Sequence, residues 1–280
     1  MGRWIALLIA PVALGAASAG ADTSSQLPRA ALVPNAVAFI DRLHGVLGTG
    51  WEGCGNHALH CRLHGTISLT TDGGSTWRVV LRTQRPVVAV AYFHDAFEAR
   101  LDNGRALWAD SAALKWHRGS RLSLAGYCPK SWESGIQADV LDANLSPPWS
   151  VCSGVPGAGN QAKAVYRGTK RVAYTPIASH GGYGGIGRYG YPTGIAGTHG
   201  GFGIIWESRG TLYVTHDGGH HWQALPTVAR PEIDFGDWAN ANVYPDGTAF
   251  VLLSIGGGET RRLLETTDAA RTWRVVHGWR

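Results

Sequence analysis

Three acidic residues stand in the same short pattern, and their carboxylates are the first groups in this chain that could do chemistry. The stretches "TTDGGSTW" (70–77), "VTHDGGHHW" (214–222) and "TTDAARTW" (266–273) each place an Asp two residues after a Thr and five residues before a Trp. A carboxylate beside hydroxyl groups could bind a ligand, but a ligand site is needed once, whereas a turn must be rebuilt in every repeat. We therefore predict a structural role for the Asp and Trp of each copy: Asp72, Trp77, Asp217, Trp222, Asp268 and Trp273.

The residue types explain how such a turn would be stabilised. In a tight hairpin an Asp carboxylate accepts hydrogen bonds from backbone N–H groups of its own turn. The glycines that follow supply positive φ angles, and the Trp, returning on the next strand, fills space against neighbouring strands. His220 and His221 occupy turn positions in the second copy, so we expect exposed side chains there rather than a catalytic base.

Residues 1–21 have the features of an export signal. Arg3 precedes an apolar run (4–17) that is too short to span a bilayer, and small residues at 17–21 offer a cleavage site. We expect a mature start near Gly20 or Asp22, a linker over 22–34 and one domain over 35–280. The mature chain is then secreted, periplasmic or otherwise extracytoplasmic, and it does not span a membrane.

The four cysteines could form disulfides or help to bind a metal. An exported chain meets an oxidising compartment, and zinc-finger spacing is absent, so we predict two disulfides and no metal or other cofactor. Nearest-neighbour pairing would join Cys54 to Cys61 and Cys128 to Cys152. The metal alternative would use the first pair with three neighbouring histidines: His57, His60 and His64.

Net charge limits the classes of partner. The chain of 280 residues carries a formal charge of +5, but its basic residues are dispersed and form no run. Nucleic-acid binding needs a clustered basic stripe, so we expect no nucleic-acid partner. Attraction to acidic surfaces or polymers remains open.

Two weaker copies extend the repeat. "LWADSAALKW" (107–116) places Asp110 six residues before Trp116, and "AVYRGTKRVAY" (164–174) keeps the leading strand but has lost the Asp and glycines near Thr169. The five turns follow one another at intervals of 38 to 59 residues, which suits one four-stranded blade of a β-propeller per interval. The pattern therefore predicts an all-β propeller of about five four-stranded blades.

Alternating apolar residues support the strands that these blades need. The segments 36–51 and 87–110 alternate and break at turn residues, whereas glycine, proline and β-branched residues interrupt every window long enough for a helix. Sharing strands between the first and last blades would remove the exposed edges. We therefore expect the strand from Asn35 to pair in the last blade, beside Trp273–Val276.

These motifs resemble the BNR or Asp-box repeats of sialidases, sortilin-type receptor ectodomains and Ycf48-like photosystem II assembly factors. "FIDRLHGVLGTGW" followed by "ISLTTDGGSTW" is most similar to the Ycf48-like branch, and "WSVCSGVPGAGNQAKAVYR" (149–167) resembles a segment of exported bacterial proteins of this group. The likeness covers most of residues 35–280. It implies a propeller that binds another protein, although Ycf48-like factors have seven blades and about five units are visible here.

The resemblance to sialidases implies an enzymatic alternative. Those enzymes hold a carboxylate with three arginines and use a Tyr nucleophile assisted by a Glu. Candidate counterparts are the arginines Arg100, Arg188 and Arg230, the tyrosines Tyr189 and Tyr191, and the acids Glu207 and Glu232. The early motif of such enzymes is missing, so a sialidase-like glycoside hydrolase is the alternative to a non-catalytic scaffold.

The segment 181–203, "GGYGGIGRYGYPTGIAGTHGGFG", is rich in glycine. It is either a flexible loop joined to a close-packed inner strand or an adaptable surface loop that contacts a partner. The candidate contact residues are Arg188, Tyr189, Tyr191, Arg100 and Trp238. The partner would be a protein or a cell-envelope component, bound by a monomer acting as a scaffold or assembly factor. A carbohydrate-binding module is a further alternative, with Trp132, Trp149 or Trp238 as stacking platforms.

Overall fold

Strands and tight turns account for the regular structure in this computed structural model. The described residues are 32–50, 64–93, 95–113, 115–120, 128, 137–142, 149–154, 161–175, 186–187, 190–207, 212–225, 239–255 and 260–279. The predicted signal peptide, nearly all of the linker, and the Cys54 and Cys61 pair lie outside them. No helix long and apolar enough to cross a membrane occurs within the described ranges.

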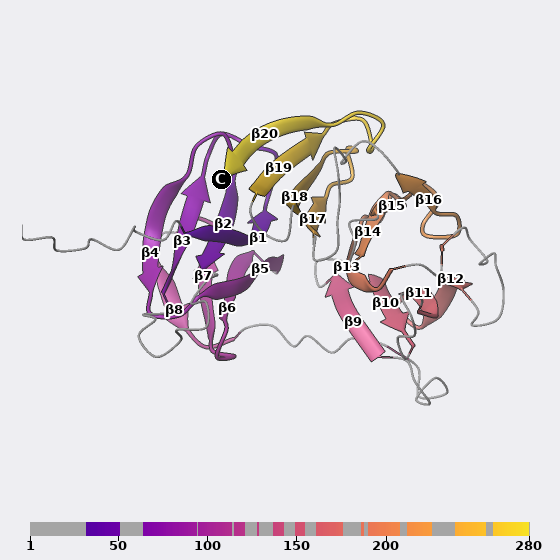
Figure 1. Cartoon of the computed structure of the whole chain (residues 1–280), viewed down its shortest axis with the longest axis horizontal. Helices are drawn as coiled ribbons and strands as arrows, with labels where there is room; N and C mark the ends of the chain where they lie inside the picture. The colour runs from indigo at the N-terminus through magenta and orange to yellow at the C-terminus, as the bar shows by residue number, and fades with distance from the viewer. Residues whose placement is uncertain are drawn as a thin grey trace, which may run out of the picture. The chain divides into compact units, whose positions relative to one another are not determined.

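The described strands form five antiparallel sheets, each of four strands in chain order (Figure 1). Sheet 1 contains β1 (Val33–Phe39), β2 (Gly45–Gly50), β3 (Gly65–Thr70) and β4 (Arg78–Thr83). Sheet 2 contains β5 (Val87–Phe93), β6 (Ala96–Leu101), β7 (Ala106–Asp110) and β8 (Trp116–Arg118). Sheet 3 contains β9 (Gln137–Asp142), β10 (Trp149–Ser153), β11 (Lys163–Arg167) and β12 (Lys170–Thr175). Sheet 4 contains β13 (Pro192–Gly197), β14 (Gly203–Glu207), β15 (Leu212–Thr215) and β16 (Gln223–Leu225), and sheet 5 contains β17 (Ala239–Val243), β18 (Ala249–Ile255), β19 (Thr260–Thr266) and β20 (Arg274–Trp279). The predicted all-β class and four-stranded antiparallel sheets are confirmed.

Each sheet has two ends with different connections. Because neighbouring strands alternate in direction, the turns between strands one and two and between strands three and four lie at the same end of a sheet. We call this the box end; it carries the turns at 40–44, 71–77, 168–169, 198–202, 216–222, 244–248 and 267–273. The opposite end, which we call the connector end, carries the links between strands two and three and between successive sheets.

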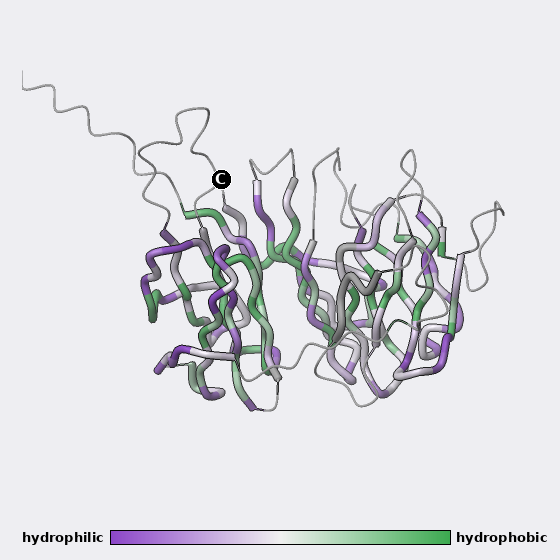
Figure 2. The backbone as a smooth tube through the Cα atoms, turned by 90° about the horizontal axis from the view of Figure 1, so that it is seen from below, coloured by the Kyte–Doolittle hydropathy of each residue, from purple (hydrophilic) through white to green (hydrophobic). Residues whose placement is uncertain are grey.

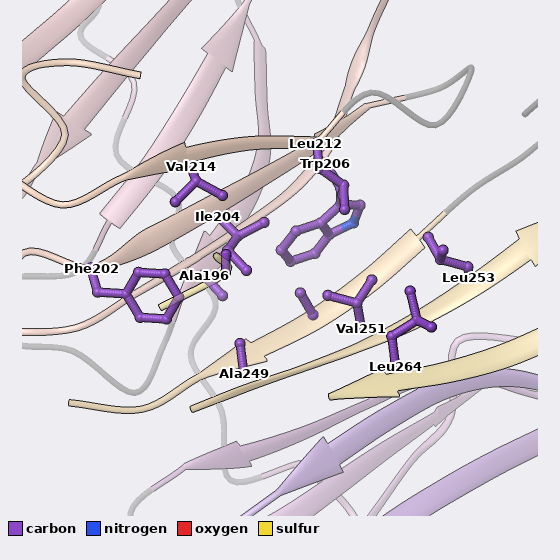
Figure 3. Close-up of a cluster of buried hydrophobic side chains, with 12 residues drawn as sticks. Ala196, Phe202, Ile204, Trp206, Leu212, Val214, Ala249, Val251, Leu253 and Leu264 are labelled. Carbon is purple, nitrogen blue, oxygen red and sulfur yellow. The ribbon is translucent and has the colours of Figure 1, made fainter. Parts of the chain in front are cut away.

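Neighbouring sheets pack face to face through separate apolar clusters. The first strands lie in contact from sheet to sheet: β5 with β1, β1 with β17, β17 with β13, and β13 with β9. Between sheets 5 and 1 the rings of Phe250 and Phe39 stack at 3.9 Å. Between sheets 4 and 5 side chains such as Ile204, Trp206 and Val251 point toward one another (Figure 3). Figure 2 shows hydrophobic stretches running along the strands, as burial on both faces of a sheet requires.

Asparagine side chains join the first strands to one another. Asn240 Oδ1 on β17 accepts a hydrogen bond from the Val37 N–H of β1 at 3.2 Å. Asn35 Nδ2 on β1 donates to the Val87 carbonyl of β5 at 2.9 Å. An amide both donates and accepts, so it can satisfy backbone groups that no strand partner reaches.

The predicted sharing of strands between the first and last sheets is wrong. β1 pairs with β2, whereas Arg274–Trp279 pairs with β19. The reason is that residues 239–279 supply four strands of their own, which leaves β1 to complete sheet 1. Sheets 1 and 5 are instead joined by side chains, including the buried Arg261, whose Nε donates to the Pro34 carbonyl at 3.1 Å.

Candidate functional site

The Asp carboxylate of each box accepts hydrogen bonds from its own turn. In the first box Thr70 Oγ1 donates to Asp72 Oδ1 at 2.8 Å, while Thr76 donates through its N–H at 2.9 Å and through its hydroxyl at 2.6 Å. The Thr272 N–H and hydroxyl donate to Asp268 at the same two distances. These carboxylates therefore tie together a turn between two strands.

The second box uses a histidine where the others use a threonine. The His221 N–H donates to Asp217 Oδ1 at 2.9 Å, and His221 Nδ1 lies 2.5 Å from Asp217 Oδ2. Thr215 Oγ1 completes the set with a bond of 2.9 Å to Oδ1. The His221 side chain is 82% exposed. Within the described contacts it therefore serves the turn, as the threonine does in the other two boxes.

Hydrogen bonding lowers the pKa of all three box aspartates. For Asp268 the Thr272 hydroxyl and N–H lower the pKa to about 2. For Asp217 partial burial opposes the change, but hydrogen bonds from His221 and Thr215 lower the pKa to about 2. The Thr76 hydroxyl and N–H likewise lower the pKa of Asp72. A carboxylate that accepts several hydrogen bonds favours its charged form.

The residues after each Asp fix the turn against its surroundings. The Gly73 N–H donates to the Leu43 carbonyl at 2.9 Å, which joins the two box-end turns of sheet 1. Gly74 has φ +89°, and a Cβ added there would lie 2.4 Å from Leu263 Cδ2 in sheet 5. Gly219 is held in the same way, since its added Cβ would lie 3.0 Å from the Trp149 ring of sheet 3. The first box therefore packs against sheet 5, and the second packs against sheet 3.

The fourth copy was predicted at the right turn, but Asp110 is not its box residue. Trp108 pairs with His117, as Leu69 pairs with Arg78 in the first box. This register aligns Ser111, rather than Asp110, with the box Asp. The turn keeps two box features: Ala113 has φ +50°, and its carbonyl accepts the Trp116 Nε1–H at 3.2 Å.

The fifth copy is a short hairpin without a box. Arg167 pairs with Lys170 across a turn at Gly168 and Thr169. The Arg167 guanidinium lies 5.1 Å from the centre of the Trp149 ring. Trp149 is fully buried, so it is no platform for a sugar.

The predicted contact residues fall on different parts of the fold. Arg100 on β6 is 43% exposed and lies 3.5 Å from the buried Glu98 carboxylate. Tyr191 is half-buried and directly precedes β13. The remaining candidates lie outside the described residues: Arg188, Tyr189, Trp238, Trp132, Arg230 and Glu232.

A buried charge cluster lies between sheets 3 and 4 at their connector ends. Lys163 Nζ at the start of β11 is 2.6 Å from Glu207 Oε1 at the end of β14, and both side chains are fully buried. Lys163 Nζ also donates to the Gly187 carbonyl at 2.8 Å. No donor from the described residues reaches Glu207 Oε2. The sequence did offer one signal for Lys163, because a charged residue stands inside a strand of alternating apolar residues. A buried charge needs a partner, so this position predicts a buried ion pair.

Burial also shifts the proton equilibria of this cluster. It raises the pKa of Glu207 to about 7, although the Lys163 ammonium acts in the opposite direction. It lowers the pKa of Lys163 against the effect of Glu207. Burial and the Glu207 charge raise the pKa of Tyr213 to about 12. A pKa near 7 suits a general acid, but the buried Glu207 contacts Lys163 rather than solvent.

The cysteines and histidines divide between described and undescribed parts. A disulfide joins Cys128 to Cys152 of β10. Cys54, Cys61, His57 and His60 lie outside the described residues, and of the metal alternative only His64 lies within them. Among described residues no group of three or more His, Cys, Asp or Glu side chains is arranged to hold a metal ion.

No protein family and no curated protein matches this chain. Similar solved structures include Ycf48 bound to a D1 peptide (16% identity, TM-score 0.42), where the match covers 88% of this chain and 82% of that one. A GH32 β-fructofuranosidase of Bombyx mori with sucrose (10%, TM-score 0.43) is matched over 87% and 61%. The lectin of Aleuria aurantia, a six-bladed β-propeller that recognises fucose (13%, TM-score 0.36), is matched over 89% and 78%. With TM-scores below 0.5, these likenesses assign no function.

Proposed function

We propose that this chain is an exported, non-catalytic β-propeller of about five blades. It binds another protein through the connector ends of its sheets, as a scaffold or assembly factor. The three Asp boxes are structural parts of the blades rather than ligand sites. The residues proposed to contact the partner are Arg188, Tyr189, Tyr191, Arg100 and Trp238.

One observation carries this proposal: the box carboxylates are used within their own turns. Asp72, Asp217 and Asp268 each accept at least three hydrogen bonds from residues two or four positions away. The box ends therefore offer compact, self-bonded turns. Several links at the connector ends, such as 51–64, 119–136 and 226–238, are longer than the box turns, and partner-binding residues commonly lie on such links over a rigid scaffold.

The described residues give less support to a glycoside hydrolase. Arg100 is paired with Glu98 of its own strand, and Glu207 is paired with Lys163. An arginine that clamps a substrate carboxylate and a glutamate that assists a nucleophile must both reach one substrate. Here each contacts a different protein charge, on different sheets.

Affinity capture tests the proposed function. The mature chain serves as bait in extracts of the secreting cell, beside an Arg188→Ala/Tyr189→Ala variant. Leu43→Ala, at an exposed box-end position, is the matched control. We expect the control to retain the partner and the double variant to lose it. Equal capture by all three proteins would reject this surface.

A further inference from the structure

Gly187, which precedes β13, is held through both of its backbone polar groups. The Gly187 carbonyl accepts from Lys163 Nζ at 2.8 Å, and the Gly187 N–H donates to the Tyr213 hydroxyl. One residue earlier, the Ile186 carbonyl accepts from Thr175 Oγ1 at 2.5 Å. Three side chains from three strands of sheets 3 and 4 thus form hydrogen bonds with the backbone of two consecutive residues.

The space around Gly187 is narrow, in addition to these hydrogen bonds. A Cβ added at Gly187 would lie 2.5 Å from the Tyr213 hydroxyl oxygen, so only glycine allows the backbone to approach this closely. Ile186 is buried in the apolar cluster of sheets 3 and 4, together with Val165 and Ile205. The dipeptide is therefore fixed by packing and by hydrogen bonds at once.

Glu207 explains why a charged donor can serve here. A lone buried ammonium is costly, and a carboxylate at 2.6 Å offsets that cost. Within the described part of the chain, Lys163 is the ion-pair partner of this carboxylate, and Oε2 meets no donor. Apolar residues of similar size often replace a buried ion pair without loss of stability. We therefore look for the role of this pair in its contact with Gly187.

We infer that Lys163, Glu207 and Tyr213 form a latch that fixes Ile186 and Gly187 and thereby positions Tyr191 and the start of β13. They are positioning residues: they act on the proposed partner-binding surface through the backbone and do not touch the partner. This inference rests on the proposed function for its purpose. The latch itself is a property of the chain alone.

Amide hydrogen exchange of the purified mature chain, without any partner, tests the latch. The Lys163→Met/Glu207→Leu variant replaces the pair with apolar residues of similar volume, and Tyr213→Phe removes one hydroxyl. We expect the Gly187 amide to exchange about ten- to a hundred-fold faster in both variants, with little change in the unfolding midpoint. Arg85→Met/Asp102→Leu, which removes a more exposed ion pair at a connector end, should leave Gly187 unchanged.

The outcomes separate the latch from the function. Parent-like exchange of Gly187 in both folded variants would overturn the latch. If the charge-pair variant fails to fold, Tyr213→Phe still decides. Faster exchange together with failed partner capture by the parent chain would reject the proposed function and keep the latch.

Discussion

The backbone N–H of His221 lies 2.9 Å from Asp217 Oδ1, and the same bond recurs between Thr76 and Asp72 and between Thr272 and Asp268. One carboxylate thus holds a turn whose ends are two adjacent strands. Because the bond joins residues four positions apart in every box, it belongs to the repeat rather than to one site.

Removing this carboxylate should cost stability. Asp217→Ala leaves the His221 N–H and the Thr215 hydroxyl without their acceptor, so we expect the free energy of unfolding to fall by about 1–2 kcal/mol in urea titrations. Asp110→Ala is the matched control, since Asp110 does not occupy the box position, and it should stay within about 0.5 kcal/mol of the parent. Equal losses would contradict the assigned register.

The box aspartates should also make stability depend on acid. Their pKa values in the folded chain, about 2 for Asp217 and Asp268, lie below the ordinary value of 3.8. Their contribution is therefore present above about pH 4 and is lost as pH falls toward 2. Urea unfolding between pH 5 and 2 should show a shallower loss for Asp268→Asn than for the parent. Superimposable pH profiles would count against the hydrogen bonding described.

Two glycines with similar φ angles allow the cost of backbone strain to be distinguished from the cost of a steric clash. Gly74 and Gly104 have φ +89° and +79°, but an added Cβ meets Leu263 at 2.4 Å in the first case and nothing within 4 Å in the second. We expect Gly104→Ala to lower the free energy of unfolding by about 1 kcal/mol and Gly74→Ala by about 2–4 kcal/mol. Thermal unfolding of the two variants measures the difference. Similar unfolding midpoints for the two variants would show that Gly74 does not pack closely against Leu263 of sheet 5.

Glu207 should contribute a pH dependence of opposite sign. Its pKa rises from 4.5 to about 7 on folding, so its contribution to stability is fully present below about pH 4.5 and is lost as pH rises through 7. Glutamine cannot ionise, so the stability of Glu207→Gln relative to the parent should increase between pH 5 and 8. Glu98→Gln, at another buried carboxylate, is the control. A constant difference across this range would refute the assignment to Glu207.

The strands and their tight turns could be predicted because their signals are local. Alternation over 87–110 predicted β5, β6 and β7, and the turn at Asp102, Asn103 and Gly104 separates the last two. The box pattern likewise lies within eight residues. Each of these features is decided by neighbours along the chain, which a sequence shows directly.

Features that depend on distant partners could not be predicted. The pairing of β1 follows from how many strands residues 239–279 supply. The box position of Ser111, by contrast, was available in the sequence, because Ser111 lies five residues before Trp116, and the register confirms it. Glu207 was a candidate by type, but its partner Lys163 comes from another sheet. Only the packing of sheets 3 and 4 brings these two charges together.

The central claim is that the box ends stabilise the sheets while the connector ends bind the partner. Partner capture by two variants tests this claim most directly. Asp217→Asn alters a box, and Arg188→Ala/Tyr189→Ala alters the proposed contact surface; both are assayed at a temperature where circular dichroism shows them folded. The account predicts that the box variant captures the partner as the parent does, while the double variant does not. Loss of capture by the folded box variant, with capture retained by the double variant, would contradict it.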